Sequence, residues 1–177
     1  MAAVLDRLSD ALDRLCRWGA LAGVVAMVVL IGIQVFARYV LRDPPGWTEE
    51  GARYAMVWAG LLGATLAFRR RTDPVLTSLA VFESGAGRVI AEAMRAVATL
   101  LFLGPIGWFC VFGPGFDVSR GYVGRSLARA TESMGITMAW FTIALPLAIA
   151  VIFVHLAAGA ARSRAPGGQD DPAPGSG

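Results

Sequence analysis

Side chains that could carry out chemistry are few in this sequence. Glu49 and Glu50 come nearest to an acid and base pair, but neighbouring residues of a helix point about 100° apart, so their carboxylates do not converge on one substrate. The single histidine, His155, cannot form a bis-histidine haem site or a histidine-rich metal cluster, and we expect it to pack between helices or to lie at the membrane interface. No Gly-x-Ser-x-Gly, Walker or Gly-x-Gly-x-x-Gly motif occurs. These observations predict a protein that is not an enzyme and that has no metal site and no cofactor.

The candidate functional residues gather in residues 34–50, a stretch between the first two long apolar runs that we call the hinge. Its diproline, Pro44 and Pro45, must break any helix, and Thr48 then has the position of a helix N-cap. Charge at a membrane boundary is costly unless it is paired or hydrated. The residues selected as structural or subunit-interface residues are Gln34, Arg38, Tyr39, Trp47, Glu49, Glu50, Arg53 and, in the last apolar run, Pro146.

Two interpretations stay open for Gln34 and Arg38, which lie one helical turn apart on a shared face. In the first, both side chains reach a partner subunit. In the second, Gln34 forms a hydrogen bond to another helix of the same chain, and Arg38 pairs with Glu49 or Glu50. The two interpretations are compatible with each other.

The composition is typical of a membrane protein. Of the 177 residues, 56% are hydrophobic and only 16% are charged. All sixteen basic residues are arginines, and they cluster between apolar runs without forming a basic stripe, which argues against nucleic-acid binding. Cys16 and Cys110 fall toward opposite membrane faces, so we expect no disulfide between them.

Four apolar runs predict an all-α integral membrane domain over residues 1–161, with four transmembrane helices. The first run is too long for the apolar core of a signal peptide, so we expect it to remain as a helix. Within it, Gly19 and Gly23 form a Gly-x-x-x-Gly pair, which reflects either close helix packing or chance. The predicted spans are about 18–41, 53–69, 96–116 and 133–161, the second being short because only residues 54–68 are uncharged.

Amphipathic and polar segments flank these spans. Residues 4–17 and the segment after Pro74 have the apolar spacing of short interfacial helices. Residues 162–177 cannot build a core, which predicts a disordered tail. Ten arginines lie on the side of the two termini and six on the other side, so we expect both termini in the cytoplasm.

Several pieces of the sequence resemble the small membrane subunit (DctQ-like) of tripartite ATP-independent periplasmic (TRAP) transporters. They are Gln34-Val35-Phe36-Ala37-Arg38-Tyr39-Val40-Leu41, Trp47-Thr48-Glu49-Glu50, Arg53-Tyr54, Trp58, Gly63-Ala64 and, later, Ala144-Leu145-Pro146-Leu147. The resemblance covers roughly residues 15–160. It departs from the family pattern at Asp73, which stands where the family often carries a histidine after the second span.

The resemblance implies a multi-pass subunit of the bacterial inner membrane that supports a large multi-span permease subunit. The large subunit would carry the solute and sodium sites, and a periplasmic solute-binding protein would deliver the solute, commonly a carboxylate; membrane lipid would surround the complex. One alternative is a membrane-anchor subunit of a respiratory or redox enzyme complex, which predicts haem or quinone ligands. Another is a self-contained exporter, which predicts a polar residue at the membrane midplane. The apolar centres of spans one, two and four favour a scaffold over a pore.

Overall fold

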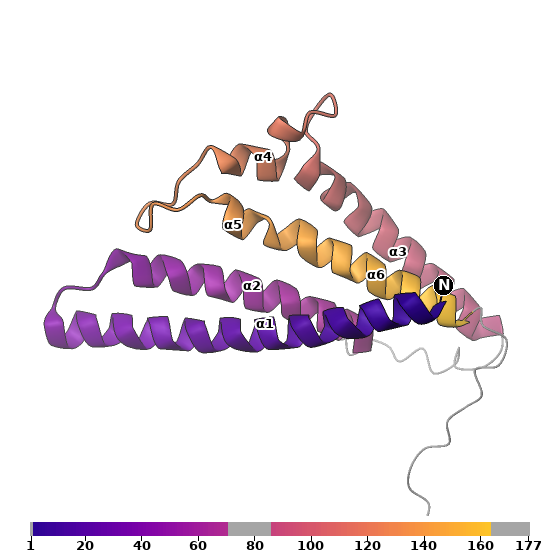
Figure 1. Cartoon of the computed structure of the whole chain (residues 1–177), viewed down its shortest axis with the longest axis horizontal. Helices are drawn as coiled ribbons and strands as arrows, with labels where there is room; N and C mark the ends of the chain where they lie inside the picture. The colour runs from indigo at the N-terminus through magenta and orange to yellow at the C-terminus, as the bar shows by residue number, and fades with distance from the viewer. Residues whose placement is uncertain (1, 71–85, 164–177) are drawn as a thin grey trace, which may run out of the picture.

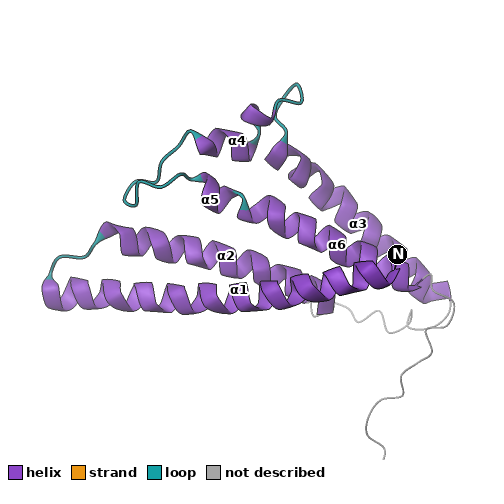
Figure 2. Ribbon diagram, viewed as in Figure 1, coloured by secondary structure: helices purple, strands orange, loops and turns teal. Residues whose placement is uncertain are grey.

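The computed structural model describes residues 2–70 and 86–163, and this part of the chain is built from helices joined by loops (Figures 1 and 2). A single β-bridge, between Ala130 and Thr137, is the only strand-type pairing among the described residues. The predicted all-α class is therefore confirmed for them. The helices are α1 (Ala2–Phe36), α2 (Gly46–Arg70), α3 (Ala86–Val111), α4 (Tyr122–Leu127), α5 (Ala139–Thr142) and α6 (Ala144–Ser163), with a π-helical turn at Ala37–Leu41 and a 3-10 turn at Val118–Arg120.

The four long helices form an open fan. Helices α1 and α2 are an antiparallel pair joined by the hinge, α6 packs against both of them, and α3 packs on α6. Figure 1 shows these helices converging near the N-terminal end of α1 and spreading apart toward the hinge. The molecule therefore has a convergent end and a hinge end.

Small residues set the close approach of α1 to α2. A Cβ atom on Gly19 would lie 2.7 Å from the Cδ1 atom of Leu62, and one on Gly23 would lie 3.1 Å from the Cβ atom of Ala59. A Cβ on Gly23 would also lie 3.2 Å from the carbonyl oxygen of Ala55, so a larger side chain there would push the helix backbones apart, whereas at Gly19 the flexible end of Leu62 can move aside. The packing interpretation of the Gly-x-x-x-Gly pair is confirmed.

Three helical segments of the described chain are long and apolar enough to cross a membrane: Ala3–Leu41, Ile90–Val111 and Ala139–Ala161. The predicted second span belongs to α2, which is 25 residues long but is not among these three. Glycines and the charged residues near both of its ends lower its hydropathy.

Helices α2 and α3 begin before the predicted spans, at Gly46 and Ala86, and three other predicted segments also differ from the structure. Residues 4–17 are not a separate interfacial helix, because α1 continues through them without a break. Residues 112–116 lie beyond the end of α3, where Pro114 cannot continue a helix. Residues 133–138 belong to a connection, and the last long helical segment begins only at α5. The predicted interfacial helix after Pro74 and the predicted disordered tail fall mainly on residues outside the described ranges.

Candidate functional site: the hinge and the polar clasp

The hinge begins with a change of helix type at the end of α1. After the π-helical turn, Arg42 adopts a left-handed conformation (φ 57°) and its backbone N–H donates to the carbonyl oxygen of Ala37. Helix α2 starts at Gly46, two residues earlier than predicted. Thr48 is therefore not an N-cap: its hydroxyl donates to the carbonyl oxygen of Pro45 at 2.7 Å instead of accepting a helix N–H.

Glu49 connects the two helices on either side of the hinge. The Nε2 atom of Gln34 on α1 donates to its Oε2 atom at 3.2 Å, so the interpretation of Gln34 as a hydrogen-bond donor to another helix is confirmed. Arg53, one turn further along α2, lies 3.6 Å from the other carboxylate oxygen, and both of these side chains are more than half exposed. An exposed ion pair of this spacing contributes only about 0.3–0.5 kcal/mol, so the bond from Gln34 is the informative contact.

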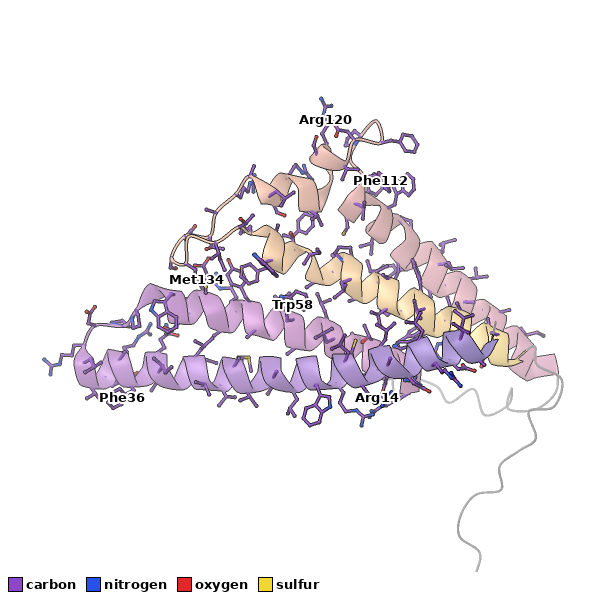
Figure 3. The ribbon with its side chains drawn as sticks, viewed as in Figure 1. Arg14, Phe36, Trp58, Phe112, Arg120 and Met134 are labelled. Carbon is purple, nitrogen blue, oxygen red and sulfur yellow. The ribbon has the colours of Figure 1, made fainter. Side chains whose placement is uncertain are left out.

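Glu50 has a different role from its neighbour because its side chain is buried. It accepts three hydrogen bonds: from the hydroxyl of Tyr54 at 2.7 Å, and from the backbone N–H groups of Ser133 at 2.9 Å and Met134 at 3.2 Å. The bond from Tyr54 above all, with those from Ser133 and Met134, lowers the pKa of Glu50 to about 2, against the opposing effect of burial. The carboxylate thus anchors the connection between α4 and α5 to the first turns of α2, over which Met134 lies (Figure 3).

Arg38 does not form the ion pair considered from the sequence. Its side chain is exposed, and among the described residues it takes part in no ion pair, because Glu49 and Glu50 are bonded elsewhere. Tyr39 and Trp47 beside it are also exposed, with 77% and 44% of their surfaces accessible. The hinge therefore presents Arg38, Tyr39 and Trp47 outward.

Pro146, the remaining residue selected from the sequence, lies outside the hinge, near the start of α6. The predicted span from residue 133 would have put this proline mid-helix. At the start of a helix the missing N–H removes no intrahelical bond or only one, which explains why α6 accommodates it there.

A second polar cluster lies at the convergent end, and we call it the polar clasp: Ser9, Asp10 and Asp13 of α1, Arg69 of α2, and His155 of α6. The Oγ atom of Ser9 lies 2.8 Å from the Nδ1 atom of His155, and all of Ser9, Asp13 and His155 are buried. His155 is thus a helix-packing residue, which confirms one of the two roles expected for it.

Arg69 is the central cation of the polar clasp. Its guanidinium donates to the carbonyl oxygen of Ser9 at 3.0 Å, forms an ion pair with Asp10 and lies 3.5 Å from Asp13. Asp13 also pairs with Arg17 at 3.1 Å. Apart from His155, none of the clasp residues was selected from the sequence. A signal for the clasp was available: aspartates and arginines alternate in residues 6–17, and an arginine cluster that could pair with the aspartates follows the second apolar run.

The two clusters hold helices together and leave the middle of the fan apolar. Among residues 2–70 and 86–163 there is no group of three or more histidine, cysteine, aspartate or glutamate side chains that could hold a metal ion. Cys16 and Cys110 are both free and buried. The charged groups of the site therefore serve packing and contact at the two ends of the helices.

Comparison with known proteins gives one family. The family described as the DctQ component of tripartite ATP-independent periplasmic transporters matches residues 27–165, a range that includes the hinge, α2, α3 and α6. Comparison with curated proteins gives no match. The N-terminal part of α1, with the clasp residues Ser9, Asp10 and Asp13, lies before the matched range.

Proposed function

The chain belongs to the family of DctQ components of tripartite ATP-independent periplasmic transporters, and we propose that it acts in such a transporter as a scaffold for a large multi-span permease subunit. Proteins of this family are small permease subunits and not enzymes. In this proposal the large subunit carries the solute and sodium sites. A periplasmic solute-binding protein delivers the organic solute, a carboxylate, and the complex lies in the bacterial inner membrane.

One observation carries the scaffold role: the long helices each contain an apolar stretch without Asp, Glu or Arg, at residues 18–36, 54–68, 96–111 and 144–161. A carrier that moves ions needs polar groups or broken helices near the membrane midplane. In α1, no residue between Trp18 and Phe36 is charged, and the buried Thr65 of α2 satisfies its hydroxyl on the carbonyl oxygen of Leu62. In this proposal the described helices offer surfaces to a partner, and the partner supplies the path for the solute.

We further propose that α2 crosses the membrane as well, which gives four spans in all, and that both termini are cytoplasmic. Helix α2 returns antiparallel from the hinge to the convergent end, which places Arg69 and Arg70 on the side of the N-terminus, as the arginine distribution requires. Reporter fusions after residues 71 and 164 are expected to report cytoplasm, and fusions near Gly46 and Gly124 to report periplasm. Inverted signals at two of these sites would overturn the topology.

In this proposal the exposed hinge residues Arg38, Tyr39 and Trp47 contact the large subunit. Arginine and aromatic residues are enriched at protein interfaces, where they supply large contact areas. Glu50 fixes the start of α2 through its buried hydrogen bonds, and the exposed contacts of Glu49 with Gln34 and Arg53 add to this. Pro146 has a structural role at the start of α6.

Reconstitution tests the scaffold role. The purified chain alone in proteoliposomes is expected to take up no carboxylate solute under a sodium gradient, and uptake is expected when the large subunit and the binding protein are added. The matched control is the large subunit with the binding protein but without this chain, which is expected to be unstable or inactive. Sodium-dependent uptake by the chain alone would refute the proposal.

A further inference from the structure

The N-terminal part of α1 exposes a stripe of apolar side chains. Val4, Leu8, Leu15 and Trp18 recur at helical spacing, and between 47% and 69% of each is accessible. The stripe continues along the same face through Val25, Val29, Ile33 and Phe36, which are also exposed. It is therefore continuous with the face that α1 presents to lipid in its membrane-spanning part.

This continuous stripe is longer than a bilayer core is thick. From Val4 to Phe36 the helix rises by about 48 Å, against about 30 Å for the hydrocarbon core and about 40–45 Å with the headgroup layers. With Phe36 at the opposite edge of the core, Leu15 lies about 32 Å away, at the near edge. The turn with Arg14 therefore enters the headgroup layer, and the turns before it, with Arg7 and Val4, reach the outer surface of that layer.

Two arginines flank the stripe in this segment. Arg7 and Arg14 are two helical turns apart on one edge of it, both are exposed, and within the described chain neither takes part in an ion pair. Arg14 lies on the side of α1 turned away from α6 (Figure 3). Their positive charges are thus at the surface next to the apolar side chains.

The acidic residues of the same segment do not cancel these charges at the surface. By sequence, Asp6, Asp10 and Asp13 equal the three arginines of residues 6–17 in number, which gives no net charge. In the structure, Asp10 and Asp13 pair with Arg69 of α2, and Asp13 pairs with Arg17 as well. Arg14 borders the same hollow as Asp10, Asp13, Arg69 and Arg70, but the counter-charges of these carboxylates come from Arg69, Arg70 and Arg17. Within the described part of the chain, the polar clasp therefore leaves Arg7 and Arg14 as uncompensated charges beside the apolar stripe.

We propose that this face, formed by Arg7, Arg14 and the stripe from Val4 to Trp18, binds the headgroups of anionic phospholipids. Charge complementarity selects the anionic headgroup, and the apolar stripe inserts beside it, as in amphipathic helices at membrane surfaces. The proposal goes beyond the scaffold function and does not depend on a partner subunit. It assigns a lipid class to a part of the chain outside the family match.

The test uses the full chain in lipid nanodiscs. A fluorophore on Ala3→Cys, in a chain with Cys16→Ala and Cys110→Ala, reports quenching by phosphatidylglycerol or phosphatidylcholine carrying a nitroxide headgroup. The unmodified face is expected to prefer phosphatidylglycerol. Because each arginine near a charged membrane surface strengthens association about fivefold, Arg7→Gln with Arg14→Gln is expected to reduce the preference by between about fivefold and twenty-fivefold.

Two control pairs separate charge from folding and from position. Arg7→Lys with Arg14→Lys keeps the charge and is expected to keep the preference. Arg125→Gln with Arg129→Gln removes two exposed arginines, one in α4 and one just after it, and is expected to leave the preference unchanged. No preference in the starting chain, or an equal loss in the pair at residues 125 and 129, overturns the proposal. The proposal is also overturned if Arg7→Gln with Arg14→Gln leaves the lipid preference unchanged but abolishes co-purification of the large subunit. That result would mean that the face binds protein.

Discussion

Replacement of Arg69 by glutamine gives the most direct test of the polar clasp. The guanidinium joins α2 to α1 through the carbonyl oxygen of Ser9 and the carboxylates of Asp10 and Asp13. Only 19% of the Arg69 side chain and 10% of the Asp13 side chain are exposed, whereas 59% of the Asp10 side chain is exposed. The substitution therefore removes two shielded contacts and one that water screens.

The expected loss follows from these three contacts. A hydrogen bond from a charged donor contributes about 1.5–3 kcal/mol, and the exposed pair with Asp10 adds about 0–1 kcal/mol. Loss of one partner from a fully buried ion pair costs about 3–5 kcal/mol, but Asp13 keeps its pair with Arg17, so this contribution is small. Arg69→Gln is thus expected to lower the free energy of unfolding by about 2–4 kcal/mol. For a chain of this size that corresponds to a decrease in Tm of roughly 5–15 °C.

Thermal unfolding in detergent, followed by tryptophan fluorescence, measures this decrease. The matched control is Arg53→Gln on the same helix, whose ion pair with Glu49 is exposed on both sides and is worth about 0–1 kcal/mol. Raised salt is expected to abolish the small effect at Arg53 and to leave most of the effect at Arg69. Equal decreases in Tm for the two variants would refute the reasoning, because burial would then not distinguish the two arginines.

Three further predictions concern the hinge and the loop beyond α3. The low pKa of Glu50 means that its stabilising contribution is complete above about pH 4.5 and is lost as the pH falls toward about 2. Between pH 5 and pH 3, Tm should therefore fall more in the unmodified chain than in Glu50→Gln. Gly121→Ala should cost about 1–3 kcal/mol of stability, because its Cβ would overlap the carbonyl group of Val111. Gly104→Ala meets open space and should be neutral or slightly stabilising, and parallel Tm measurements compare the two variants. Arg38→Glu should weaken co-purification with the large subunit, and adding Glu50→Arg should not restore it, because Glu50 is bonded to Tyr54 and to the α4–α5 connection; recovery in the double variant would show that the two side chains pair after all.

Local patterns in the sequence were sufficient for much of the fold. The diproline of the hinge separates α1 from α2 as expected, since proline at these positions ends a helix wherever it occurs. The Gly19 and Gly23 pair predicted a close helix contact, which α2 provides. The all-α class and the turn between α1 and α2 depend on residues that are neighbours in the sequence, and so a single sequence is enough to predict them.

The contacts of the two clusters could not be predicted in this way. Glu50 and Ser133 are 83 positions apart, and Ser9 and His155 are 146 apart. No periodicity links such residues, because their contact depends on how α6 and the α4–α5 connection pack on the first helix pair. The ion pair considered between Arg38 and the two glutamates does not form, because Gln34 and Arg53 bind Glu49, while Tyr54 and the α4–α5 connection bind Glu50.

In the proposed topology, in which α2 also crosses the membrane, these distant contacts offset its low hydropathy. The residues from Arg53 to Arg69 rise by only about 24 Å, less than the hydrocarbon thickness of about 30 Å, so charges near both ends of α2 lie close to the apolar layer. Such charges are costly when they are unpaired. The charge of Arg69 is paired with Asp10 and Asp13 of α1 in the polar clasp. At the other end of α2, the charge of Glu50 is stabilised by the backbone N–H of Ser133 in the α4–α5 connection. In that topology, the hydropathy of α2 taken alone overstates the cost of its insertion, because Arg69 and Glu50 find their partners only when α1 and the chain beyond α3 pack around α2.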